Sequence, residues 1–127
     1  MNTISKIFLI IGSTNAFLAV ALGAFAAHYL KNRLTPDMLA VFNTGVHYHG
    51  YHALGIILIG IVALWLPGSI YLKWAGAIMF IGIVLFSGSL YVLSISGMRV
   101  FGVITPIGGL AFLAAWALLV FAVAKAT

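Results

Sequence analysis

The chain has 127 residues, of which 65% are hydrophobic and only 6% are charged, and Asp37 is its single acidic residue. Its mean hydropathy is +1.25. A soluble domain of this length would have too few polar groups to cover its surface, so this composition excludes a soluble globular protein. The six basic residues are scattered and form no cluster, which excludes an electrostatic nucleic-acid interface. The absence of cysteine excludes disulfides and thiolate metal ligands.

Four apolar stretches, each long enough to cross a bilayer, follow one another along the chain. They cover residues 5–30, 46–66, 72–95 and 103–124, and the connections between them are short. Short connections force neighbouring helices to run in opposite directions. The sequence therefore predicts one all-α transmembrane domain over residues 1–127, an antiparallel four-helix bundle with both termini on the same side of the bilayer.

The segment between the first two spans has the pattern of a helix start. Thr35 can cap a helix, Pro36 suits its first position, and Asp37 is favourable near the positive end of the helix dipole. Apolar residues on one side of residues 36–44 predict a short interfacial helix there, with a simple connector as the alternative. Thr105, which also precedes a proline, predicts a similar cap on the fourth span.

The basic residues do not determine the orientation in the membrane. Three lie on each side of the predicted bundle, so the positive-inside rule favours neither orientation. One side has Lys6, Lys73 and Lys125, and the other has Lys31, Arg33 and Arg99.

Small residues in the first span predict a close helix contact. Ala19, Gly23 and Ala27 are spaced by four and share one helix face, which lets another backbone approach. Gly60 instead has Ile56 and other apolar neighbours. We therefore expect a larger side chain to disturb the bundle more at Gly23 than at Gly60.

The histidines are the sharpest chemical feature of the sequence. His47, His49 and His52 cluster at the start of the second span, and His28 ends the first, so all four fall toward the same membrane face. Three interpretations are open: hydrogen bonding among His and Tyr side chains, handling of protons or a polar solute, and a metal site of His28, His49 and His52. The first is favoured, since only Asp37 offers a carboxylate to support metal ligands. We predict no bound metal and no cofactor.

Polar groups of the other spans gather toward the same face, where Ser87 and Tyr91 share one side of the third span. In hydrocarbon such groups must find one another or water, so we expect them to converge. In particular, we expect His28 and His52 to face the bundle interior within reach of each other. The candidate polar crevice consists of Asn15, His28, His49, His52, Ser87, Tyr91 and Thr105.

Four ordered motifs resemble a known family. They are Gly23-Ala24-Phe25-Ala26-Ala27-His28, Tyr48 to Leu54 around His52, Phe86-Ser87-Gly88-Ser89-Leu90-Tyr91, and Thr105-Pro106-Ile107-Gly108-Gly109-Leu110. Together they resemble the small four-span family of bacterial YgdD-like inner-membrane proteins, which has a eukaryotic relative. The resemblance covers almost the whole chain and implies the four-span fold and a multi-pass location in the bacterial inner membrane.

Two positions depart from the pattern of that family. Ala26 stands where glycine is usual, and His49 stands where glutamine is frequent. A glutamine would be a poor metal ligand, so the second departure weakens a metal site built on His49. The family has no assigned biochemical activity, and the resemblance therefore does not imply a function.

Several function classes are excluded by residues that the spans lack. There is no Ser/His/Asp set and no phosphate-binding loop, so we predict no catalytic residues and no enzyme. The leading hypothesis is a non-enzymatic membrane protein that packs with other membrane components, in a homo-oligomer or a larger complex, to support envelope integrity or serve as an accessory subunit. The alternative is a small-solute or proton carrier or channel that uses the polar crevice, although no span contains a carboxylate.

Overall fold

The computed structural model describes residues 1–127, and all its regular elements are helical. They are α1 (Thr3–His28), the 3-10 turn η1 (Leu30–Asn32), α2 (Pro36–Val62), α3 (Ile70–Gly82), the π-helical segment η2 (Ile83–Ser87), α4 (Gly88–Ser96), the 3-10 segment η3 (Arg99–Val103) and α5 (Thr105–Ala124). Because η2 joins α3 to α4 without a break, Ile70–Ser96 is one long helical stretch. The prediction of four helices long and apolar enough to cross a membrane is confirmed.

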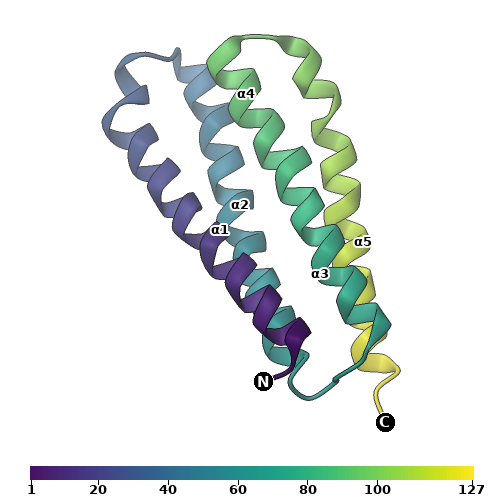
Figure 1. Ribbon diagram of the computed structural model, residues 1–127. Helices are drawn as coiled ribbons and strands as arrows, with labels where there is room; N and C mark the ends of the chain where they lie inside the picture. The colour runs from purple at the N-terminus through teal and green to yellow at the C-terminus, as the bar shows by residue number, and fades with distance from the viewer.

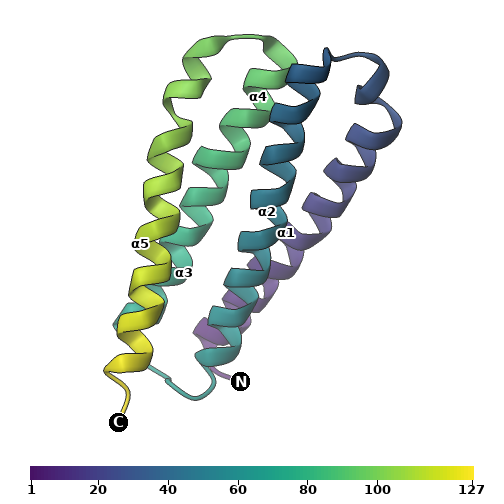
Figure 2. The ribbon, with the colours of Figure 1, turned by 180° about the vertical axis from the view of Figure 1, so that it is seen from behind.

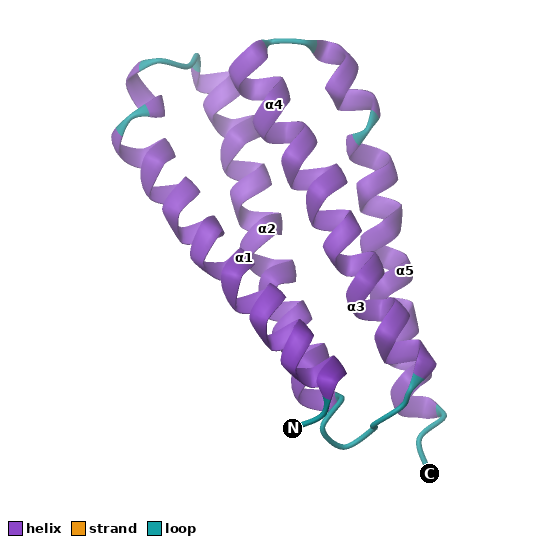
Figure 3. Ribbon diagram, viewed as in Figure 1, coloured by secondary structure: helices purple, strands orange, loops and turns teal.

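The long helices form two pairs. The chain reverses direction at each connection, and both termini lie at one end of the molecule, which we call the lower end (Figure 1). α1 packs along α2, and α3 packs along α5, while α2 also contacts α3, η2 and α4. Seen from behind, α2 and α5 lie in front (Figure 2). The loops are confined to the two ends of the bundle (Figure 3).

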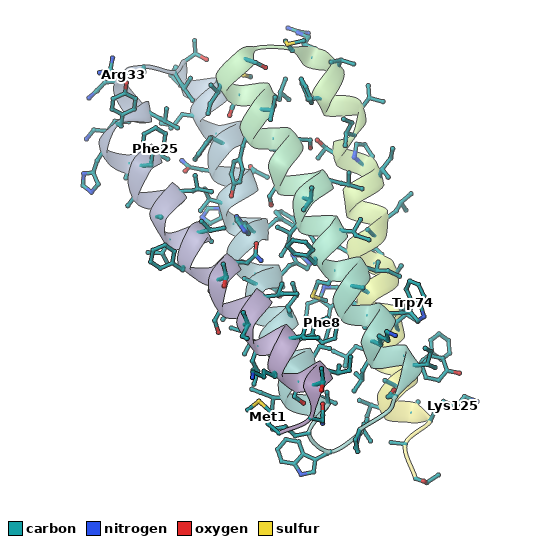
Figure 4. All side chains as sticks on the ribbon, viewed as in Figure 1. Met1, Phe8, Phe25, Arg33, Trp74 and Lys125 are labelled. Atoms are coloured by element: carbon teal, nitrogen blue, oxygen red, sulfur yellow. The ribbon has the colours of Figure 1, made fainter.

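Apolar side chains fill the space between the pairs. The main core contains Phe8, Ile56, Ile59, Ala63, Leu72, Ala75, Met79, Ile83, Phe112, Ala115 and Ala122. Phe8 reaches from α1 toward α3 (Figure 4), where a Cβ added at Gly76 would collide with its ring. A smaller cluster of Ala26, Leu30 and Phe42 closes the upper end, between α1 and α2. Packing in the bundle therefore depends on large rings fitted against small residues.

The second long helix differs from the prediction. Thr35 caps it as expected, because its hydroxyl accepts the Met38 N–H at 3.3 Å. A separate interfacial helix over residues 36–44 is wrong, however, because α2 continues unbroken from Pro36 to Val62. No proline interrupts it, and Gly45, the first of its four glycines, is buried against Tyr91. The helix also ends before residue 66, where turns lead into Pro67-Gly68.

The π-helical segment η2 was not expected from the sequence. The Gly88 N–H bonds to the Ile83 carbonyl, so this turn holds one residue more than an α-helical turn. It lies at a close approach of α5, since a Cβ at Gly108 would collide with the Phe86 backbone nitrogen. At this turn the Phe86 ring packs against both Tyr48 of α2 and Phe112 of α5, and Ser87 donates to the Gly45 carbonyl of α2 at 2.7 Å.

The structure contradicts the packing argument for ranking Gly23 above Gly60, while the stability ranking itself stays a prediction. A Cβ at Gly23 would meet only the Val46 side chain at 3.3 Å, whereas one at Gly60 would lie 3.1 Å from the Leu9 backbone nitrogen. Ala19 is buried, but Ala27 at the other end of the expected stripe is exposed. α1 leans away from α2 toward the upper end (Figure 1), so the close contact lies further down than the spacing of small residues suggested.

Gly12 lies at this close contact and gives a test of it. We expect Gly12→Ala to destabilise the protein by about 1–3 kcal/mol. The added Cβ would lie 2.6 Å from Ile57 Cγ1 and 2.9 Å from the Ile57 backbone nitrogen, which cannot move independently of α2. Thermal unfolding in detergent would measure the change.

Gly88→Ala is the matched control, because nothing lies within 4 Å of a Cβ at that position. Alanine favours a helix over glycine by up to about 1 kcal/mol, so this variant should unfold at the same or a higher temperature. Equal melting temperatures for the two alanine variants would contradict the close approach of α1 and α2.

Candidate functional site

Three polar side chains form a hydrogen-bonded chain across the bundle, from α1 through α2 to α4. Nε2 of His49 lies 2.9 Å from Oδ1 of Asn15, and its Nδ1 lies 2.9 Å from the Tyr91 hydroxyl. Asn15 also donates from Nδ2 to the Ile11 carbonyl at 2.9 Å. Asn15 and His49 are both buried. Both ring nitrogens of His49 are therefore used to hold helices together.

The partners of His49 assign its tautomer. Because the amide nitrogen of Asn15 donates to the Ile11 carbonyl, the amide oxygen is the group that faces His49. That oxygen can only accept, so the ring proton lies on Nε2. The Tyr91 hydroxyl then donates to the bare Nδ1. In this row of hydrogen bonds, each donor of Asn15, His49 and Tyr91 therefore faces an acceptor.

His52 makes a separate set of contacts, toward α5. Its Nδ1 lies 2.8 Å from the Tyr48 carbonyl, which only accepts, so Nδ1 carries the proton. The Trp116 Nε1–H donates to Nε2 at 3.0 Å. The imidazole also stacks on the Phe112 ring, with the ring centroids 3.5 Å apart. His52 therefore connects α2 to α5 and does not face α1.

Serine and threonine hydroxyls join the remaining helices. The hydroxyls of Ser89 and Thr105 lie 2.6 Å apart and connect α4 to α5. The predicted cap at Thr105 is wrong, because Ile104 is the N-cap of α5 and no side chain caps that helix. The Thr105 hydroxyl instead hydrogen-bonds to the Ser89 hydroxyl and donates to the Phe101 carbonyl at 3.4 Å.

The structure therefore brings only some of the candidate crevice residues together. Asn15, His49 and Tyr91 are joined by hydrogen bonds. Ser87 lies beside them, because it donates to the carbonyl of Gly45, which packs against Tyr91. His52 and Thr105 make their contacts elsewhere.

The expectation that His28 faces the bundle interior near His52 is wrong, because His28 is exposed. It lies two residues from both Ala26 and Leu30, which are buried against α2. At about 100° per residue, a position two residues away points to the opposite side of a helix. His28, His49 and His52 accordingly do not meet at a common point.

Sequence reasoning missed Trp116, which holds His52 in place. Trp65 and Trp74 lie near the ends of helical stretches, where tryptophan is common in membrane proteins, and Trp74 points outward in Figure 4. Trp116 lies well inside the fourth apolar stretch. An indole N–H surrounded by hydrocarbon needs an acceptor, so its position was a usable signal for a partner on another helix.

A groove of about 750 Å³ opens on the side of the bundle between α2 and α5, the two helices in front in Figure 2. Its deep wall includes the buried rings of His52 and Phe112. Neither Lys, Arg, Asp nor Glu lines it. The lining residues are His47, Tyr48, Tyr51, His52, Phe86, Pro106, Gly109, Leu110, Phe112, Leu113 and Trp116.

We expect His49 and His52 to be neutral and to carry their protons on different ring nitrogens, Nε2 in His49 and Nδ1 in His52. The cause is the fixed polarity of their partners, Asn15 Oδ1 for the first ring and the Tyr48 carbonyl for the second. Nitrogen-15 NMR of protein labelled at histidine would distinguish the two tautomers.

Trp116→Phe removes the donor to Nε2 of His52, so in this variant only the signals of His52 should change. The exposed His28 is the internal reference. The same tautomer for His49 and His52, or a change at His49 in the Trp116 variant, would contradict the assignment.

Comparison with known proteins identifies similar chains. The family described as "Protein of unknown function (DUF423)" matches residues 22–109. That range includes His28, His49, His52, Ser87, Tyr91 and Thr105, and excludes Asn15 and Trp116. No solved structure matches the chain.

Several curated relatives match along almost their whole length. The UPF0382 membrane protein YwdK of Bacillus subtilis is 49% identical over 94% of this chain and 98% of its own. A UPF0382 membrane protein of Staphylococcus saprophyticus is 45% identical over the same shares. The UPF0382 inner membrane protein YgdD of Escherichia coli is 40% identical over 91% of this chain and 87% of its own.

Proposed function

We propose, given that this chain belongs to the DUF423 family of proteins of unknown function, that it binds another component of the membrane in the groove between α2 and α5. The chain is a membrane protein, with four helices suited to crossing a bilayer and with relatives named as membrane proteins. In this proposal it is not an enzyme. It acts as an accessory protein that supports the envelope by holding a molecule that enters sideways from the lipid.

The groove is the observation that carries this proposal. Its volume of about 750 Å³ is typical of sites that hold small molecules. It lies in the middle of two membrane-spanning stretches, away from both ends of the bundle, so an occupant would enter from the bilayer. A closed four-helix bundle would have covered lining residues such as Tyr51 and Leu113, which are exposed here, with a neighbouring helix.

The same residues give less support to catalysis. The nitrogens of His49 and His52 are bonded to Asn15, the Tyr48 carbonyl and Trp116. A general base must be free to take a proton from a substrate, and these rings would first have to break a bond between helices. In the same proposal the four spans cross the bilayer in alternating directions, as the helices do in Figure 1. The first turn of α2 then lies at the membrane interface.

Photo-crosslinking from within the groove tests the proposal. We expect p-benzoylphenylalanine at Leu113 to form an adduct of defined mass when membranes that contain the protein are irradiated. Leu113 lines the groove and is 68% exposed. Mass spectrometry of the purified protein would identify the adduct as lipid, another chain or a second copy.

Leu54 is the matched control, because it is a leucine of a spanning helix, is 63% exposed and does not line the groove. It should give only the diffuse products of contact with bulk lipid. If Leu113 gave the same products as Leu54 in the same yield, the proposed function would be wrong.

The alternative of a proton or small-solute carrier rests on the chain through Asn15, His49 and Tyr91. This alternative ranks second because the row of hydrogen bonds ends at the Ile11 carbonyl. An amide such as that of Asn15 also does not readily pass a proton on. If the alternative holds, proteoliposomes should carry a proton flux that His49→Leu abolishes and His28→Leu leaves unchanged. No flux above that of empty liposomes would reject it.

A further inference from the structure

The walls of the groove differ in chemistry from one helix to the other. α2 contributes His47, Tyr48, Tyr51 and His52, whereas α5 contributes mainly apolar side chains, including Leu110 and Leu113. An occupant that satisfies both walls must therefore be amphipathic across its width, with polar atoms toward α2.

Three side chains on the α2 wall have hydrogen-bonding atoms without a partner in the chain. The His47 ring, the Tyr48 hydroxyl and the Tyr51 hydroxyl make no hydrogen bond to the protein, and all three residues are exposed. They lie inside a membrane-spanning stretch, where an unpaired polar group is costly. Each can donate, so acceptor atoms such as carbonyl oxygens are the best partners.

The lining of the groove also indicates the charge of its occupant. No Lys or Arg lines it, so the phosphate of a phospholipid headgroup would find no cation there, and no Asp or Glu is available for an amine. An uncharged occupant is favoured, because an ion inside the bilayer without a counter-charge is strongly disfavoured.

Aromatic rings favour a flat occupant. Phe86 and Tyr48 pack with ring centroids 4.5 Å apart, and Phe112 stacks on His52, so the deep wall is built from aromatic rings. A planar conjugated ring can stack on such a wall. The α5 wall runs from Pro106 to Trp116, about 15 Å at the rise of an α-helix, which leaves room for an apolar tail.

We propose that the groove binds a planar, uncharged ring that bears carbonyl groups and an apolar tail, which is the chemistry of a lipid-soluble quinone. The carbonyl oxygens accept from His47 and Tyr51, and the tail follows Leu110 and Leu113. This inference rests on the proposed function, because it names the component that the groove holds.

Tryptophan fluorescence provides the test, because quinones quench indole emission and Trp116 lines the groove. The full chain with Trp65→Phe and Trp74→Phe, in phosphatidylcholine nanodiscs, is titrated with decylubiquinone. We expect saturable quenching. The reference protein has Trp65→Phe and Trp116→Phe and retains only Trp74, which is exposed outside the groove, so it should show only the linear quenching of quinone dissolved in lipid.

Matched substitutions separate binding from partition into the bilayer. His47→Ala and Tyr51→Phe, made in the protein that retains Trp116, should each raise the half-saturating concentration by about 2- to 10-fold, the value of one hydrogen bond. His28→Ala and Tyr71→Phe make the same changes at positions that do not line the groove and should have no effect. His47 and Tyr51 are exposed, and an unchanged melting temperature would confirm that these variants fold.

Three outcomes would overturn the inference. They are linear quenching of Trp116 like that of Trp74, saturable quenching that His47→Ala and Tyr51→Phe do not weaken, and equal displacement of the quinone by dioctanoylglycerol, which has carbonyls but no ring. If the quinone fails to bind while Leu113 still crosslinks to one defined partner, the inference is wrong and the proposed function stands. If Leu113 behaves like Leu54, the proposed function fails as well.

Discussion

The constraint that governs this structure is that polar groups in hydrocarbon must be satisfied by the chain itself. Asn15, His49 and Tyr91 meet this requirement by bonding to one another across α1, α2 and α4. His52 meets it with Trp116 of α5. His49 and His52 are therefore two of the points at which the two helix pairs are joined. The groove beside them carries polar atoms that this arrangement leaves unpaired.

Sequence reasoning was successful where the bilayer imposes a length and a polarity. Four spans, the Thr35 cap and the burial of His49 and His52 follow from apolar runs, local hydrogen bonding and the cost of exposing an imidazole to lipid. These features depend on one helix and its solvent, so no knowledge of the neighbouring helix is needed.

Features that depend on which helix lies opposite were not predictable in the same way. His28 was placed inside because it lies at the same depth as the others, but its rotation is fixed by Ala26 and Leu30, which face Phe42. Gly23 and Gly60 were ranked by their own neighbours in sequence, whereas the contact depends on the tilt of α1. The groove could not be foreseen, because it results from α5 packing mainly on α3 and η2 and leaving one face of α2 open.

Because of the extra residue in η2, the protein should tolerate the deletion of one residue there better than elsewhere in the third span. A π turn absorbs one residue without rotating the helix that follows, so loss of Val84 or Leu85 would convert the turn into ordinary α-helix and leave Ser89 and Tyr91 aimed at their partners. Loss of one residue from the regular part of α4 would instead turn every later side chain by about 100°. Among in-frame deletions in the third span, those in Ile83–Ser87 should therefore be the ones that leave the α4 contacts intact.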